Sequence, residues 1–276
     1  MEFAGLPTWY IYSAAFILGA LWGSFANVCI ARIPEGGSVL WPPSRCPFCR
    51  SPIRSYDNIP FFSWLLLGAR CRDCRVRIPA RYPMVELLVA TLSLALAMRS
   101  ASPATFAVFF CFTLALVVLS FIDLDHWLLP NVITYPGIAA GLAVSFAGLE
   151  NPAGAIITPL QSMIGALLGG GILYAVAIVF KAATGKVGMG MGDVKLLAMV
   201  GAFLGWQSIL PVVMMSSLQG SIVGLIMLFA GKDDHADPGK PGGSPDEFVP
   251  TRHHIPYGPF IALGALEYMF YGPALF

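Results

Sequence analysis

Charged residues are scarce in this sequence: only 11% of its 276 residues are Asp, Glu, Lys or Arg, against 57% hydrophobic residues and a mean hydropathy of +0.74. Soluble domains carry roughly 25% charged residues, so the composition excludes an ordinary soluble domain, and it also excludes a disordered chain or a coiled coil. The six cysteines are too few for a secreted disulfide scaffold. The composition therefore indicates a polytopic membrane protein.

Eight apolar stretches approach or reach the roughly 17–25 residues that a helix needs to cross a bilayer core. They lie near 9–30, 83–98, 103–122, 131–149, 157–180, 194–206, 208–230 and 257–275. The run from Leu196 to Gly231 has 36 residues without a charge, which is too long for one upright span, so we divide it at 205–208. The sequence predicts an all-α fold with about eight transmembrane helices, the sixth of them short.

The basic residues indicate how these helices are oriented. Fifteen of the sixteen Lys and Arg fall in or beside the loops 31–82, 123–130, 181–193 and 231–256, and only Arg99 falls on the opposite side. Basic residues are retained on the cytoplasmic side of a membrane, so these loops are expected inside and both termini outside. The start of the chain contains Glu2 and no basic residue, unlike the start of a cleaved secretory signal, so we expect the first helix to remain.

The loop 31–82 contains two CxxC pairs separated by 21 residues, formed by Cys46, Cys49, Cys71 and Cys74. Four thiolates in this spacing can close tetrahedrally on Zn²⁺, and a set of four cysteines leaves no open position for a reacting water. The sequence thus predicts a small cytoplasmic zinc-binding domain with a structural metal. Unliganded thiols or a redox pair are the alternative, and nucleic-acid binding is a weak rival because the loop is tied to the bilayer at both ends.

Carboxylates at the predicted membrane boundary require an explanation, because ionisable groups at membrane depth are costly. Asp123 and Asp125 follow the third span, and Asp193 opens the sixth after three glycines, at 188, 190 and 192. The predicted orientation places all three at cytoplasmic helix ends. Two carboxylates that meet can share one proton and act as base and acid, as in an aspartic protease.

Simpler interpretations of the same residues remain open. Asp193 could be only the N-cap of the sixth helix, and Asp123 and Asp125 could be interfacial residues exposed to water. Glycines such as Gly190 and Gly192 would let an extended peptide approach the backbone closely. We name these two glycines as candidate substrate-binding residues.

Six segments together resemble the type IV prepilin peptidases, which are membrane aspartic proteases. They are Gly23–Pro34, the paired CxxC loop, Arg81–Leu87, Asp123–Asn131, Gly190–Asp193 with its GxGD signature, and Ile255–Phe260. The resemblance carries the family's catalytic pair onto Asp193 and onto the aspartate seven residues before Pro130, which is Asp123. Asp125 is the less favoured holder of this role.

The resemblance implies that the chain cleaves short basic leaders from type IV prepilins or type II secretion pseudopilins, on the cytoplasmic side of the bacterial inner membrane. In family members with the cysteine loop it also implies N-methylation of the new terminus by S-adenosylmethionine. No nucleotide-binding glycine motif locates the methyl donor. Glu86 and Asn27 are candidates for this site, and ordinary helix-end polarity explains them equally well.

The predicted organisation is a first transmembrane helix in 1–30, the zinc-binding loop domain in 31–82 and a seven-helix peptidase domain in 83–276, with a flexible loop at 231–256. The expected partners are prepilin substrates and membrane lipid, with no nucleic acid. Two other classes are considered: an ion-coupled transporter whose aspartates relay protons, and a structural assembly subunit that would need neither aspartate.

Overall fold

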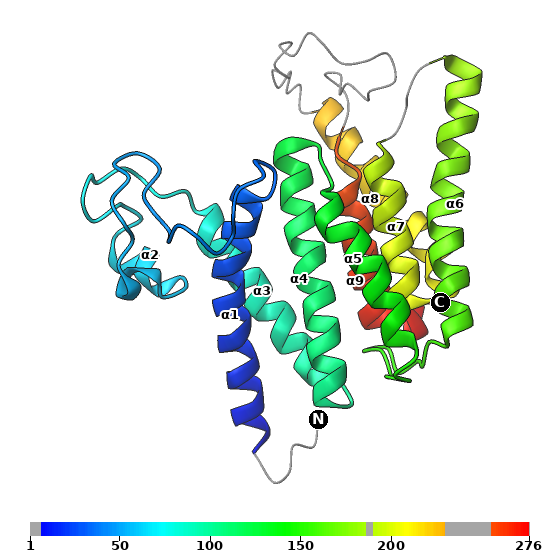
Figure 1. The fold of residues 1–276 in the computed structure, drawn as a ribbon, viewed down its shortest axis with the longest axis horizontal. Coiled ribbons are helices and arrows are strands. Elements are labelled where there is room, and N and C mark those ends of the chain that lie inside the picture. The colour runs from blue at the N-terminus through cyan, green and yellow to red at the C-terminus, as the bar shows by residue number, and fades with distance from the viewer. Residues whose placement is uncertain (1–6, 186–189, 230–254, 276) are drawn as a thin grey trace. The chain divides into compact units, whose positions relative to one another are not determined.

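The computed structural model describes residues 7–185, 190–229 and 255–275, and in these residues the chain is helical, with isolated bridges in place of β-strands (Figure 1). The α-helices of the described residues are α1 (Thr8–Arg32), α2 (Phe62–Leu66), α3 (Arg81–Arg99), α4 (Pro103–His126), α5 (Asn131–Ser145), α6 (Pro159–Thr184), α7 (Met191–Leu204), α8 (Ile209–Phe229) and α9 (Gly258–Leu275). Two short 3₁₀ helices, η1 (Ser55–Asn58) and η2 (Trp206–Ser208), lie between them. The predicted all-α class is confirmed.

Each of the eight apolar stretches contains one helix, and five of these helices are long and apolar enough to cross a membrane: α1, α3, α4, α6 and the segment Trp206–Phe229 that includes α8. The division of the long apolar run is confirmed, because α7 ends at Leu204 and Gly205 follows with a φ of +80°. Glycine adopts this backbone conformation at little cost, so it allows the chain to turn into η2 and α8.

The chain divides into two compact units, Met1–Ile122 and Asp123–Phe276. In the first unit α1 packs along α3. A Cβ at Gly23 would lie 2.7 Å from the Cα of Glu86, so only glycine permits this approach. Ser93 of α3 donates a hydrogen bond to the carbonyl of Ala15 (2.6 Å), which joins the two helices inside an apolar contact. The loop 31–82 is therefore anchored on two helices that pack side by side.

Helix α7 forms the core of the second unit, where it packs against α5, α6, α8 and α9. Every residue from Val194 to Leu204 except Lys195 is buried, as expected for a helix that is apolar on all sides. Gly201 of α7 faces Gly165 of α6 across backbones so close that a Cβ on either would overlap the other. Small residues at such crossings are typical of helix pairs in membranes.

Candidate active site and metal centre

The candidate carboxylates Asp123 and Asp193 both belong to the second unit and both are buried. Asp123 lies in the last turn of α4 with 6% of its surface exposed, and Asp193 is the third residue of α7 with 9% exposed. The two side chains are near enough to interact electrostatically. The sequence allows these two helix ends to meet, and the structure brings the two aspartates near each other.

A third segment completes this site. The backbone N–H of Gly258, at the start of α9, donates a hydrogen bond to Oδ2 of Asp123 at 3.1 Å. A Cβ at Gly258 would lie 2.6 Å from the same oxygen, so the backbone of α9 sits directly against the carboxylate. Sequence reasoning did not assign this contact. The sequence indicates this part of the chain only through the segment Ile255–Phe260, which resembles the prepilin peptidases but carries no side chain with an evident role in the site.

Leu129 fills the space between the three segments. A Cβ at Gly192 would lie 2.8 Å from Cβ of Leu129, and one at Gly258 would lie 3.3 Å from its Cδ1. Gly192 therefore has a packing role that needs the absence of a side chain. Among the described residues, the nearest atom to a Cβ built at Gly190 is the backbone N of Gly192, at 3.9 Å. The glycine at 188 lies outside the described residues.

The capping of α7 and the burial of the aspartates bear on the two simpler interpretations of these residues. The N-cap of α7 is Gly190, with no side-chain capping bond, so the interpretation of Asp193 as an N-cap is wrong. Asp125 and His126 are both exposed, whereas Asp123 is buried. An exposed carboxylate has little reason to share a proton, so the pairing geometry favours Asp123 over Asp125.

Lys195, two residues after Asp193, holds the start of α7 against α5. Its Nζ donates to Oδ1 of Asn131 at 2.6 Å and lies 5.3 Å from the centre of the Tyr135 ring. A charge-assisted hydrogen bond and a cation–π contact both restrict this ammonium group. The contacts join the Asp123–Asn131 segment to the GxGD segment, which sequence reasoning did not foresee.

The cysteine cluster is assembled in the first unit. The Sγ atoms of Cys46, Cys49, Cys71 and Cys74 all lie within 4.8 Å of one another, and those of Cys46 and Cys74 are 3.7 Å apart. A tetrahedral zinc with Zn–S bonds of about 2.3 Å requires sulfur–sulfur edges of about 3.8 Å. The donor set and its spacing therefore fit a four-coordinate Zn²⁺.

The two CxxC pairs are built in the same way. The carbonyl of Cys46 accepts from the N–H of Arg50 (2.9 Å), and that of Cys71 accepts from Arg75 (3.1 Å). Both arginines have a positive φ, 58° and 60°, which turns the chain back on itself. Each first cysteine then pairs its own N–H with the carbonyl five residues on, at Ser51 or Val76. Two equivalent knuckles thus present two sulfurs each.

Hydrogen bonds and burial around the knuckles act differently on the individual thiols. Bonds from Ser51 lower the pKa of Cys49 to about 6, and backbone N–H groups of Cys74 and Asp73 lower the pKa of Cys71. Desolvation and hydrogen bonds with the other cysteine side chains raise the pKa of Cys74 to about 12. Because zinc binds the thiolate form, Cys49 and Cys71 are the two thiols that this environment prepares for a metal. Arg72 makes a bidentate pair with Asp57: its Nε donates to Oδ2 at 2.8 Å and its Nη2 to Oδ1 at 2.6 Å. These bonds hold the pKa of Asp57 below its usual range.

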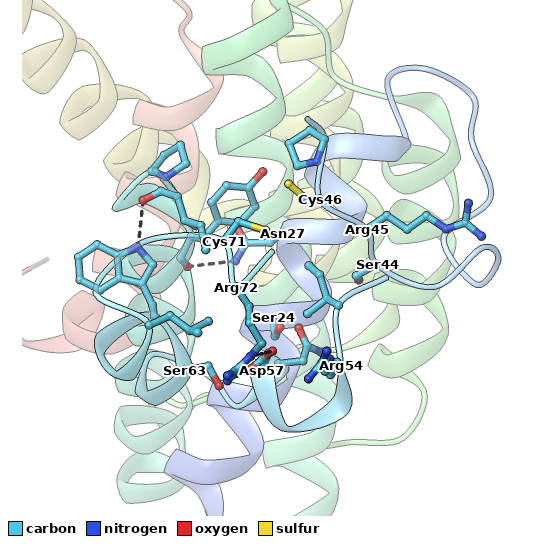
Figure 2. Close-up of a pocket in the computed structure, with 18 of the residues that line it drawn as sticks. Ser24, Asn27, Ser44, Arg45, Cys46, Arg54, Asp57, Ser63, Cys71 and Arg72 are labelled. Carbon is cyan, nitrogen blue, oxygen red and sulfur yellow. Dashed lines mark hydrogen bonds and ion pairs between the residues drawn. The ribbon is translucent and has the colours of Figure 1, made fainter. Parts of the chain in front are cut away.

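A cavity of about 480 Å³ lies beside the knuckles, entirely within the first unit. Figure 2 shows Ser24 and Asn27 of α1 around it, together with Cys46, Cys71 and the Asp57–Arg72 pair. Glu86, buried at the start of α3, also lines this space. Both polar residues that the sequence offered as methyl-donor candidates, Glu86 and Asn27, are therefore in one cavity wall, at a place that no sequence motif indicated.

Comparisons with known proteins cover both units. Residues 17–100 match the model of the bacterial peptidase A24 N-terminal domain, and residues 109–225 match the type IV leader peptidase family. The chain is 36% identical to a prepilin leader peptidase/N-methyltransferase of Myxococcus xanthus, over 94% of this chain and 90% of that protein. It is also 36% identical to a protein of the same name from Aeromonas hydrophila, over 98% of this chain and 94% of that protein. A relative of the same name from Pseudomonas putida is 33% identical over 99% of this chain and 95% of that protein.

No solved structure matches the chain. The family matches and the relatives give no support to the transporter alternative. They cover the segments that carry the cysteine cluster and both buried aspartates, and the relatives extend over nearly the whole sequence. The chain belongs to the type IV leader peptidase family.

Proposed function

We propose that this protein is a membrane aspartic endopeptidase that removes the basic leader from type IV prepilins or type II secretion pseudopilins and then N-methylates the new terminus. The single observation that carries the peptidase is the pair of buried carboxylates, Asp123 and Asp193, which lie 70 residues apart in the chain and near each other in the structure. The names of the relatives, prepilin leader peptidase/N-methyltransferase, support both activities.

The chemistry follows from two carboxylates that share one proton. The ionised member takes a proton from a water molecule, and the water oxygen attacks the scissile carbonyl carbon. The protonated member donates a hydrogen bond to the carbonyl oxygen as negative charge develops there. Collapse of the tetrahedral intermediate breaks the C–N bond, and the proton on the pair passes to the leaving amine. The N–H of Gly258 holds Asp123 in orientation throughout.

The catalytic aspartates would face the cytoplasm in the inner membrane, with eight helices in the bilayer. Three helices are added to the five long apolar ones: α5 and α9, and the buried α7. Helix α7 has 14 residues, about 21 Å, and cannot cross a core of about 30 Å by itself. Asp193 at its start would therefore lie below the headgroups, where the first apolar residues of a substrate helix also lie.

We retain the division into a first helix in 1–30, a zinc-binding loop in 31–82 and a peptidase region in 83–276. Zinc, held by the four cysteines, would be structural, and S-adenosylmethionine would supply the methyl group. The loop 231–256 falls almost wholly outside the described residues. The expected substrate has a short basic leader that ends in Gly, followed by a hydrophobic helix that begins with Phe or a similar residue. Lipid would surround the helices, and nucleic acid has no part.

The test uses Asp→Asn variants, which keep the side-chain shape and remove the acid/base function. Asp123→Asn and Asp193→Asn should each slow cleavage of a purified prepilin by about 10²–10⁴-fold, the usual contribution of a general acid or base. Asp125→Asn is the matched control in the same segment, and it should retain most of the activity. Mass spectrometry of the pilin reports leader loss and methylation together.

Two results would contradict this assignment. If Asp125→Asn is inactive and Asp123→Asn cleaves normally, the partner of Asp193 has been misassigned. If the wild-type protein leaves the prepilin at its full mass, the peptidase proposal itself fails.

A further inference from the structure

The cavity beside the knuckles has the size and composition of a small-molecule site. Its volume of about 480 Å³ falls within the range of roughly 300–1,000 Å³ that is usual for ligand pockets. Its lining runs from Ser24 on α1 through the knuckles to Glu86 on α3, and apolar side chains predominate. The charged members of the lining are Arg32, Arg45, Arg54, Arg72, Arg77, Asp57, Asp73 and Glu86. Pockets of this kind bind a ligand through apolar walls and a few placed polar groups.

Glu86 is the most unusual of these polar groups. It is 9% exposed, and its Oε2 accepts a hydrogen bond from the backbone N–H of Phe61 at 2.8 Å. Within the part of the chain that the structure describes, the recorded ion pair is that of Arg72 with Asp57, and no basic side chain pairs with Glu86. A buried carboxylate without a cationic partner is complementary to a positively charged ligand.

The neighbouring side chains supply hydrogen bonds and an aromatic surface. Asn27 lines the cavity, and its Nδ2 donates to the carbonyl of Tyr82 at 3.0 Å, which fixes the amide. Phe48, between the two cysteines of the first knuckle, is 73% exposed and lines the cavity. An exposed ring at the edge of a pocket offers a face on which a purine can stack.

We propose that this cavity binds the methyl donor, S-adenosylmethionine, with Glu86 facing a cationic group of the ligand and Phe48 contacting the adenine. The inference rests on the proposed methyltransferase activity and adds its binding site. The ligand carries a sulfonium and an ammonium group, both cationic, beside a flat purine. The buried carboxylate of Glu86 suits the two cationic groups, and the apolar wall with Phe48 suits the purine. The ligand also carries a carboxylate, which suits the arginines of the lining.

This assignment gives the cysteine cluster a structural role at the cavity. Cys46 and Cys71 belong to the cavity lining, one from each knuckle. The bidentate pair of Arg72 with Asp57 joins the second knuckle to η1, and Nε1 of Trp64 donates to the carbonyl of Ile78 at 3.1 Å, joining α2 to the chain after that knuckle. Zinc would therefore fix one wall of the donor site.

The transfer itself balances without a further reactant. After leader removal the new terminal amine, in its neutral form, attacks the methyl carbon with its lone pair. A nitrogen–carbon bond forms while the carbon–sulfur bond breaks, and the bonding electrons stay on sulfur, which becomes a neutral thioether. The methylated amine releases one proton to water.

The test measures binding directly, so it does not depend on turnover. Full-length protein in nanodiscs is equilibrated with radiolabelled S-adenosylmethionine, and separately with adenosine, which lacks both cationic groups. Glu86→Gln should weaken S-adenosylmethionine binding by about ten-fold or more, because a charge-assisted contact is lost, and should change adenosine binding by less than about two-fold. Phe48→Ala should weaken both ligands.

Glu35→Gln is the matched control, since Glu35 is an exposed carboxylate of the same unit that does not line the cavity, and it should bind both ligands as wild type does. Zinc content measured on each variant separates ligand effects from loss of the knuckles. Unchanged S-adenosylmethionine affinity in Glu86→Gln would overturn the proposal. So would equal weakening of both ligands in that variant, or unchanged binding in a zinc-loaded Phe48→Ala.

Failure of the proposed function is distinguishable, because it is seen in the wild-type protein. A wild type that neither shortens a prepilin nor methylates a pre-cleaved pilin peptide would refute the function. A wild type that does both, with Glu86→Gln binding the donor normally, would refute the site alone.

Discussion

Gly258→Ala should slow cleavage by displacing Asp123, and the size of the expected rate loss follows from the geometry. The added Cβ would lie 2.6 Å from Oδ2 and 3.2 Å from Cγ of Asp123. A carbon–oxygen contact normally needs about 3.3 Å or more, so the carboxylate or the start of α9 must move by about 0.7 Å. Leu129 limits the escape on the other side, at 3.3 Å from the same position.

A displacement of this size should be costly for catalysis. Misplacement of a reacting group by about 1 Å can reduce a rate about 10²-fold, so we expect kcat to fall by about 10–10²-fold. KM should change less than kcat, because the substitution displaces a group that acts in the chemical step. The assay is the initial rate of prepilin cleavage at several substrate concentrations, with zinc content as a check of the first unit.

Gly220→Ala is the control, because a Cβ there would meet only the Phe260 ring at 3.7 Å, an ordinary contact with the same helix α9. Alanine is also the better helix former, so neither change should weaken a helix by propensity. Wild-type kcat in Gly258→Ala would refute the argument that α9 holds Asp123 in its reactive position.

Three further predictions concern the shared proton, the metal and the separation of the two activities. Cleavage should show a bell-shaped pH profile, lost at low pH as the aspartate pair gains a second proton and at high pH as it loses the shared one; a monotonic rise with pH would contradict the pair. Purified protein should contain about one zinc per chain, and Cys46→Ser should lower that content in metal analysis, since three thiolates complete the tetrahedron poorly; freshly purified, unchelated wild type without zinc would remove this prediction. With a pre-cleaved pilin peptide, Asp193→Asn should still transfer the methyl group and Cys71→Ser should not, as measured by peptide mass; equal loss of both activities in Cys71→Ser would mean that the zinc unit supports the whole enzyme.

The helices of this fold were predictable because hydropathy and length are local properties of the sequence. The turn at Gly205 was also predictable, since an uncharged run of 36 residues exceeds one span and the basic residues require an even number of crossings. Helix lengths were less accurate. The fourth stretch was expected to reach 149, but α5 ends at Ser145, because hydropathy does not mark where backbone hydrogen bonding stops.

The candidate site was predictable where side chains carry the chemistry. The four cysteines have a spacing that implies their own geometry, and the structure brings their sulfurs together. The choice of Asp123 over Asp125 came from resemblance, and burial of the first with exposure of the second agrees with it. Gly258 was not predictable, because it acts through its backbone N–H on a residue 135 positions away.

The cavity was not predictable for a related reason. Its walls come from α1, two loop segments and α3, which meet only after the knuckles have formed. Glu86 and Asn27 were recognisable as polar residues, but periodicity cannot show that they face the same space. Their burial and their bonds to Phe61 and Tyr82 are properties of the packed loop.

The two equivalent knuckles have a consequence for how the length of this loop can vary. Cys46 and Cys74 are 28 residues apart, and a cross-link over such a span lowers the free energy of folding by about 3–4 kcal/mol in the chain-entropy model. This contribution depends on the logarithm of loop length, so ten extra residues between the knuckles would change it by only about 0.3 kcal/mol. A zinc ion held by the four cysteines would therefore tolerate insertions there. Asp57 and Phe61, which lie between the two knuckles, restrict insertions, because Asp57 is bound to Arg72 of the second knuckle and Phe61 to Glu86 of α3. These two contacts at the cavity therefore restrict the spacing of the cysteines more than a metal ion would.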